Sequence, residues 1–209
     1  MPHRYSHWRC PLKLTKAVLA AVLLGGVALT LGALVVFIAF ARNLPNPSNL
    51  EDRTITESTK IYDRTGEVIL YDIHGEERRT IIPFNEIPQT VKDATIVAED
   101  KDFYQHRGLD FKAILRAFLS NLISDSLQGG STITQQFVKK SILSDERTWT
   151  RKIKEAILAL ELERRYSKDE ILNFYLNQIP YGSNAYGIEA AALTFFSKKA
   201  ADLTLAEAA

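Results

Sequence analysis

The sequence predicts a mainly α-helical domain with a small β-hairpin at its start, preceded by one transmembrane helix. Apolar residues recur every three or four positions through most of the chain after Pro88, which is typical of amphipathic helices. An uncharged run of 25 residues lies near the N-terminus. Of the 209 residues, 46% are hydrophobic and 24% are charged, which is typical of a globular protein rather than a disordered or collagen-like one.

The uncharged run, residues 17–41, predicts a membrane span. A helix of this length would extend roughly 37 Å, which exceeds the ~30 Å thickness of the hydrocarbon core. Residues 1–16 carry Lys and Arg but no acidic residue, so we expect this tail to stay in the cytoplasm and everything after Arg42 to be exported. Cleavage after Ala39-Phe40-Ala41 is the alternative, although the run is longer than a usual signal peptide.

Composition excludes several classes of function. The 26 Lys and Arg balance the 25 Asp and Glu, a net charge of +1 that argues against a nucleic-acid partner. The single Cys excludes an intrachain disulfide and a Cys-rich zinc site, and the four His are scattered. No organic cofactor is predicted. If the exported part binds an anionic ligand, a local pocket must supply the positive charge.

The exported part divides into a linker and a domain. Residues 42–58 are rich in Pro and Asn and predict a linker, and residues 59–209 form the domain. Residues 60–73 predict a β-hairpin around Asp63-Arg64-Thr65-Gly66. Gly182 and Gly187 bound a predicted turn. The chain stops one turn after the capping box at Thr204, so we expect it to be a C-terminally incomplete fragment of a longer protein.

Helix starts are marked by capping residues. We expect helices to begin near Pro88, at Asp110, at Ser131 or Thr132, at Thr150, at Ser167 and at Thr204. Residues 111–123 carry a continuous apolar stripe. We expect this stripe to pack in the core, and dipping into the membrane is the alternative.

The first cluster with chemical potential is Glu99-Asp100-Lys101-Asp102, at the end of a predicted apolar helix. Neighbouring carboxylates and partial burial raise the pKa of a carboxyl group, as a general base requires. We therefore expect a partly buried base here. The alternative is a charged loop whose acidic residues pair with Lys101 and Arg107.

The second cluster is Gly129-Gly130-Ser131-Thr132-Ile133-Thr134-Gln135-Gln136. Two glycines permit a close backbone approach, and the N–H groups of the following helix suit a phosphate. No Gly-Lys-Ser/Thr follows, so this is not a Walker loop. A glycine helix break with ordinary capping is the alternative, although two adjacent glutamines need polar partners if they are buried.

Two further clusters lie on helices. Arg151, Lys152 and Glu155 share one predicted helix face, where cations beside a carboxylate could hold a diphosphate or, equally, form a solvated ion-pair face. Residues 168–177 form an amphipathic helix that serves mainly packing, although Tyr175 and Asn177 could point their polar ends into a cleft.

Taken in this order, the clusters resemble the peptidoglycan glycosyltransferases of glycosyltransferase family 51. Members occur alone or at the N-terminus of bifunctional class A penicillin-binding proteins. The resemblance covers about residues 59–209 and rests on Glu-Asp-x-x-Phe-x-x-His-x-Gly at 99–108, Gly-Gly-Ser-Thr-Ile-Thr-Gln-Gln at 129–136, Arg-Lys-x-x-Glu at 151–155 and Lys-x-x-Ile-Leu-x-x-Tyr-Leu-Asn at 168–177. The family's further Arg-Arg motif, after the helix that begins at Thr204, is absent.

This resemblance implies a lysozyme-like helical fold that polymerises lipid II into β-1,4-linked glycan strands. The anomeric carbon is inverted and undecaprenyl diphosphate leaves. By position in the motifs, Glu99 would be the base that deprotonates the acceptor hydroxyl. Glu155 would organise the diphosphate, with or without a divalent cation such as Mg or Mn. The residues that would bind substrate are Asp100, Ser131, Thr132, Gln135, Gln136, Lys139, Arg147, Arg151 and Lys152.

The resemblance also implies partners and a location. Lipid II, the growing strand and the membrane would be the partners, together with cell-wall synthesis proteins and a C-terminal transpeptidase domain if the chain continues. The protein would be a single-pass protein of the bacterial inner membrane, with its N-terminus in the cytoplasm and its catalytic domain on the outer face. It would serve cell-wall biogenesis and cell shape.

Two other functions stay open. A lysozyme-like hydrolase would also be helical and would use two carboxylates, placed on either side of one bond. A non-catalytic membrane-anchored scaffold would bind cell-wall precursors or division proteins, although the presence of both Glu99 and Glu155 argues against it.

Overall fold

The computed structural model describes residues 12–41, 57–66, 69–73, 75, 77–123, 129–143 and 148–209. The chain divides into two compact units, Met1–Leu44 and Pro45–Ala209. The first unit contains helix α1, Leu12–Ala41, which begins five residues before the predicted uncharged run. In the described part of the chain, no helix has both the length and the hydropathy of a membrane span. The span expected at 17–41 is therefore not shown by the structure.

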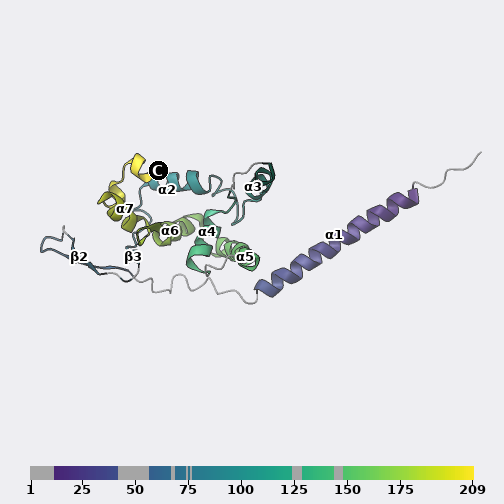
Figure 1. Cartoon of the computed structure of the whole chain (residues 1–209), viewed down its shortest axis with the longest axis horizontal. Coiled ribbons are helices and arrows are strands. Elements are labelled where there is room, and N and C mark those ends of the chain that lie inside the picture. Colours follow the sequence, from purple (N-terminus) through teal and green to yellow (C-terminus); the bar gives the residue numbers. More distant parts are fainter. Residues whose placement is uncertain are drawn as a thin grey trace, which may run out of the picture. The chain divides into compact units, whose positions relative to one another are not determined.

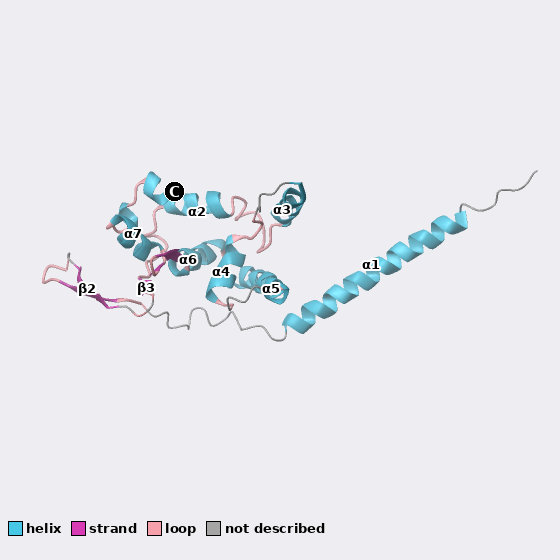
Figure 2. Cartoon of the chain, in the orientation of Figure 1, coloured by secondary structure: helices cyan, strands magenta, loops and turns pink. Residues whose placement is uncertain are grey.

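The second unit opens with the predicted hairpin. Strand β1, Thr59–Tyr62, pairs antiparallel with β2, Ile69–Ile73, and Thr59 lies opposite Ile73. Figure 2 shows the two strands as a ribbon that extends from the helical body. Large apolar side chains of the hairpin, Leu70 and Tyr71 among them, are exposed. The hairpin prediction is confirmed.

Helices form most of the second unit, as predicted (Figure 1). They are α2 (Gln89–Glu99), α3 (Phe111–Ile123), α4 (Ile133–Ser141), α5 (Trp149–Arg165), α6 (Lys168–Gln178), α7 (Ile188–Phe196), the 3-10 helix η2 (Ala200–Asp202) and α8 (Leu205–Ala208). Capping boxes at Thr132, Ser167 and Thr204 open three of them. One prediction was wrong by two residues, because α5 is capped by Thr148 rather than by Thr150.

Helices α4, α5 and α6 pack against one another and supply much of the core. Phe137 of α4, Leu158 and Leu162 of α5, and Leu172 of α6 are fully buried. A buried polar group joins the same three helices. Glu163 accepts hydrogen bonds from the Thr134 hydroxyl and from Lys168 Nζ, both at 2.6 Å. A buried charge with both partners in place fixes the arrangement of these helices.

A small sheet was not predicted. Strand β3, Arg78–Arg79, pairs parallel with β5, Ala185–Tyr186, and β5 pairs antiparallel with β4, Pro180–Gly182. The turn expected between Gly182 and Gly187 joins β4 to β5. Next to this sheet, the Asn177 side chain accepts from the Ile82 N–H and donates to the Ile82 carbonyl, both at 3.0 Å. Asn177 therefore anchors the segment that follows β3, and its side chain does not point into a cleft.

Gly187 is required where β5 meets α7. Its φ is +81°, and a Cβ atom there would lie 2.5 Å from the Asn177 carbonyl oxygen. Any side chain at this position would separate α6 from α7.

Helix α3 contradicts the prediction that its apolar stripe packs in the core. Phe111, Leu115 and Phe118 are exposed, and Ala117 is buried. The helix approaches the chain at Gly130, where a Cβ atom would lie 3.3 Å from the Ala117 Cβ. Small residues thus form the contact face and leave the large apolar side chains outside. Amphipathic spacing predicts that one face is apolar but does not predict what covers it.

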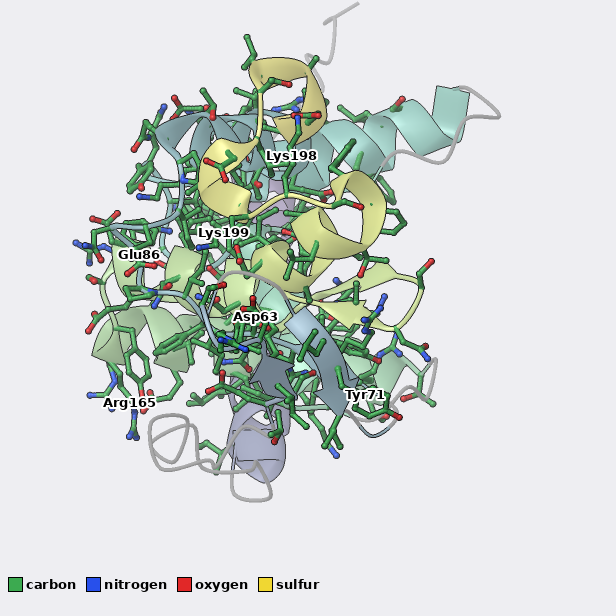
Figure 3. All side chains as sticks on the ribbon, turned by 90° about the vertical axis from the view of Figure 1, so that its left-hand side faces the viewer. Asp63, Tyr71, Glu86, Arg165, Lys198 and Lys199 are labelled. Carbon is green, nitrogen blue, oxygen red and sulfur yellow. The ribbon has the colours of Figure 1, made fainter. Side chains whose placement is uncertain are left out.

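The C-terminal segment closes over α2, because α8 packs against that helix. Lys198, labelled in Figure 3, donates to Glu207 Oε1 at 2.7 Å. This ion pair and the Thr204 hydrogen bonds lower the pKa of Glu207 from 4.5 to about 2.

Candidate active site

The first two motifs meet at one cavity. Glu99 is the last residue of α2, and it lines a cavity of about 210 Å³ together with residues 129–132 and Arg116 of α3. The carboxylate is exposed, so the expected partial burial is not found. It nevertheless faces the glycine-serine turn that precedes α4, and a bound substrate would lie against both.

Gln136 of α4 holds the Glu99 carboxylate. Gln136 Nε2 donates to Glu99 Oε2 at 2.7 Å. The Tyr175 hydroxyl of α6 donates to Gln136 Oε1 at 3.3 Å. Among the described residues, Glu99 Oε1 has no hydrogen-bond donor. That oxygen is therefore available to accept a proton from a bound hydroxyl group.

Two tyrosines have pKa values that the charge of Glu99 affects. Burial and, to a smaller extent, the charge of Glu99 raise the pKa of Tyr175 well above its usual range. Burial likewise raises the pKa of Tyr181, with smaller contributions from Tyr175 and Glu99. Tyr175 belongs to the fourth motif and was named as a candidate. Tyr181 was not predicted, because it lies on β4 outside the four motifs. Its position just before the predicted turn was the only signal.

Asp100 is turned toward the protein. Its buried carboxylate bonds His106 Nε2 at 3.0 and 2.9 Å and accepts from the Ile133 N–H at 3.0 Å. It therefore ties the loop after α2 to the N-terminus of α4. A role for Asp100 in substrate binding stays a prediction.

Thr132 and Gln135 are buried and form hydrogen bonds with each other. The Thr132 hydroxyl donates to the Gly108 carbonyl at 2.7 Å and accepts from the Gln135 N–H, while Gln135 Oε1 accepts from the Thr132 N–H. Their polar groups shape the turn. Their predicted contacts with substrate are not tested by this arrangement.

The third motif joins the cavity through Ser131. Lys152 Nζ of α5 donates to Ser131 Oγ at 2.9 Å and to Glu155 Oε1 at 2.5 Å. The Glu155 side chain is only 1% exposed, whereas that of Lys152 is 47% exposed. The ammonium group therefore neutralises a buried carboxylate while its own side chain stays partly exposed and bonded to Ser131.

The other three cationic residues that were predicted to bind substrate are Arg151, Lys139 and Arg147. Arg151 precedes Lys152 in the first turn of α5, and its buried Nε atom has no hydrogen-bond partner among the described residues. A donor of this kind needs an acceptor, which a ligand could supply. Lys139 is half-buried in the last turn of α4. Arg147 lies outside the described residues.

The donor set at Glu155 limits what metal it could hold. In the described residues, no three or more His, Cys, Asp or Glu side chains gather to form a metal site. Glu155 could offer a divalent cation one carboxylate, of which Lys152 already occupies one oxygen. The described residues alone do not form a cage for a cation at Glu155, and a cation bound there would take further ligands from substrate and water.

Comparison with known proteins identifies the family of the chain. The family model described as Transglycosylase matches residues 66–209. Penicillin-binding protein 1A of Aquifex aeolicus is 45% identical over 184 residues, which are 88% of this chain and 25% of that protein. The protein of the same name from Neisseria flavescens is 46% identical over 167 residues, 79% of this chain and 21% of that protein.

The chain thus spans about a quarter of the length of these curated relatives. Over the part that it shares with them, the identity is high enough to establish kinship. The chain belongs to the transglycosylase family, the peptidoglycan glycosyltransferases that its four motifs resemble.

Proposed function

We propose that this chain polymerises lipid II into β-1,4-linked glycan strands, with inversion at the anomeric carbon and release of undecaprenyl diphosphate. The observation that carries the proposal is the shared cavity. Glu99, whose Oε1 has no donor among the described residues, lines this cavity together with Ser131, and Lys152 donates to Ser131. A base thus lies in the cavity, and a cation is bonded to a residue of its wall.

The chemistry follows from these two groups. Glu99 Oε1 accepts the proton of the acceptor 4-hydroxyl as its oxygen attacks the anomeric carbon of the donor strand. The bond from that carbon to the diphosphate breaks, so the configuration inverts. The leaving group is already an anion and needs no proton. Lys152 and Arg151 stabilise the charge that develops on it, and an acid beside the leaving oxygen is unnecessary.

Glu155 positions Lys152 for this role. A buried carboxylate 2.5 Å from the ammonium holds Lys152 in place to donate to Ser131. A divalent cation such as Mg²⁺ or Mn²⁺, if bound, would be held by Glu155 and by diphosphate oxygens, and it would add positive charge at the leaving group. Activity in EDTA that rises several-fold on adding Mg²⁺ is the expected sign of such a cation. Activity unchanged by EDTA would refute it.

The location is part of the proposal. The uncharged residues 17–41 within α1 support a membrane anchor with the basic tail in the cytoplasm and the catalytic unit on the outer face. The exposed apolar face of α3 supports contact with the same bilayer, from which a lipid-linked substrate would enter. The names of the relatives support a transpeptidase domain in the full-length protein.

The test is polymerisation of labelled lipid II by the full chain in detergent. We expect polymer and released undecaprenyl diphosphate, and Glu99→Gln should lower kcat about 10²- to 10⁴-fold, the usual contribution of a positioned base. Glu86→Gln is the matched control. Glu86 is exposed just before α2, at the opposite end of that helix from Glu99, and is labelled in Figure 3.

Other outcomes separate the alternatives. Cleavage of preformed glycan without synthesis would indicate a hydrolase. Binding of lipid II without turnover would indicate a scaffold. Polymerisation that survives Glu99→Gln would show that another group is the base.

A further inference from the structure

Three side chains from three helices form one hydrogen-bonded series. Tyr175 of α6 donates to Gln136 of α4, and Gln136 donates to Glu99 at the end of α2. The series crosses the cavity wall from the core to the surface, because Tyr175 is buried, Gln136 is half-buried and Glu99 is exposed. Through these hydrogen bonds, a residue of the core can affect the position of the Glu99 carboxylate.

Elementary chemistry fixes the direction of each bond. An ionised carboxylate only accepts hydrogen bonds, so the Gln136 side chain must present its NH₂ group to Glu99. Its carbonyl oxygen then faces Tyr175, and the phenol must donate to it. A Gln136 amide turned by 180° would place its carbonyl against the Glu99 carboxylate and its NH₂ against the phenol, losing the bond to the charge.

Tyr175 is well placed to hold the amide in this orientation. It lies in α6 between the fully buried Leu172 and Leu176, so its ring has little freedom. Burial keeps the phenol protonated at neutral pH by raising its pKa. The bond from this phenol therefore adds a second restraint on the Gln136 amide, whose orientation the Glu99 carboxylate sets.

We propose that Tyr175 is a positioning residue that acts through Gln136 to keep Glu99 Oε1 free and directed at the acceptor hydroxyl. This inference rests on the proposed glycosyltransferase function. Gln136 occupies Oε2 and leaves the other oxygen without a donor in the described part of the chain. Without the Tyr175 hydroxyl, the Gln136 side chain would lose one of its two restraints, and the carboxylate that it holds would rotate away from the acceptor for part of the time.

The alternative is that the Tyr175 hydroxyl contacts a sugar directly. The two roles differ in a measurable way. A direct contact would contribute to substrate affinity and would act independently of Gln136. A positioning role changes kcat, leaves KM unaltered and disappears when Gln136 no longer carries an amide.

The experiment is a double-mutant cycle on lipid II polymerisation by the full chain. Tyr175→Phe removes only the hydroxyl and should lower kcat about 5- to 10-fold, the equivalent of one hydrogen bond, with KM changed less than two-fold. Gln136→Met, of similar length but without the amide, should lower kcat at least as far. The double variant should match Gln136→Met alone.

Tyr104→Phe is the matched control. Its hydroxyl bonds Asp169 at 2.9 Å, away from the Glu99 cavity. The control also loses one phenol hydrogen bond, so it should lower the unfolding temperature by a similar amount and leave kcat unchanged.

Several results would overturn the proposal. They are an unchanged kcat in Tyr175→Phe, a rise in KM alone, or an equal loss of kcat when Tyr175→Phe is added to Gln136→Met. Gln136→Asn provides a check that does not depend on the folding of the Tyr175 variant. Its amide is one methylene too short to reach both partners, and full activity would refute the series. A wild-type chain that makes no polymer would instead refute the proposed function.

Discussion

Asp100 offers the sharpest test of whether a motif residue supports the site or binds substrate. We expect Asp100→Asn to destabilise the fold, and Asp100→Ala to destabilise it more. The carboxylate is buried and bonds His106 and the Ile133 N–H. Since a carboxylate only accepts, His106 Nε2 must carry a proton, and the buried Nδ1 atom of His106 has no partner in the described part of the chain.

The size of the effect follows from these contacts. In Asp100→Asn, the new carbonyl can accept from Ile133 N–H, and the new NH₂ then faces His106 Nε2. His106 can accept this bond only by moving its proton to Nδ1, where a buried N–H would have no acceptor. An unsatisfied buried donor costs about 1–3 kcal/mol. Asp100→Ala leaves both the Ile133 N–H and the His106 Nε2–H without their acceptor, and at about 1–3 kcal/mol for each unsatisfied buried donor it costs more than Asp100→Asn.

The assay is urea unfolding of the full chain in detergent, with circular dichroism at 222 nm as the probe of unfolding. A shift of the midpoint with an unchanged m-value converts directly into the loss of unfolding free energy. Asp102→Asn is the control, two residues further along the same loop, and should stay within about 0.5 kcal/mol of wild type.

One result would refute the reasoning. If Asp100→Asn unfolds at the same urea concentration as wild type but no longer polymerises lipid II, then Asp100 contacts substrate, as its place in the motif predicts. The buried hydrogen bonds would then contribute little to stability, contrary to their geometry.

Three further outcomes are expected. Gly187→Ala should lower the free energy of unfolding by more than about 2 kcal/mol in urea, because a Cβ would lie 2.5 Å from the Asn177 carbonyl at φ +81°. Hydrogen bonds from arginine lower the pKa of Glu161 from 4.5 to about 2, so their stabilisation is present above pH 4.5 and is lost as the pH falls toward 2. Arg164→Gln should thus lower the melting temperature slightly at pH 7 but not near pH 2, since the Arg164 side chain is 71% exposed and its ion pair is screened by solvent. Phe118→Ser, at a position 61% exposed, should weaken the binding to lipid vesicles of a variant lacking residues 1–44 about ten-fold, as measured by sedimentation, whereas Tyr71→Ser on the β1–β2 hairpin, at a position 65% exposed, should not.

Local signals explain what the sequence predicted well. A capping box needs only four consecutive residues, so Thr132, Ser167 and Thr204 could be recognised as helix starts without any tertiary knowledge. The β1–β2 hairpin is similarly local, since its two strands are joined by one short turn. The error at Thr150 has the same origin. Thr148 and Thr150 are both able to cap, and the choice between them is made by contacts outside the segment.

Long-range contacts explain what the sequence missed. Strand β3 pairs with β5 across more than a hundred residues, and neither strand is long enough to show a pattern of alternation. The exposure of α3 was missed because a stripe of large apolar residues looks the same whether it faces a core, a membrane or another chain. Its contact face is marked instead by small residues, Ala117 and the distant Gly130, which no periodicity connects.

The active-site motifs mix two kinds of residue, and hydrogen-bond capacity separates them. The Thr132 hydroxyl has one proton, which it gives to Gly108, so it has none left to donate to a ligand. Ser131, by contrast, only accepts from Lys152 and keeps its own proton, while Glu99 keeps one oxygen without a donor in the described part of the chain. A side chain whose donors are spent on the protein shapes the cavity, and one with capacity to spare can contact the substrate. By this criterion the adjacent Ser131 and Thr132 have different roles. Ser131→Ala should therefore affect turnover more than stability, and Thr132→Ala should do the reverse.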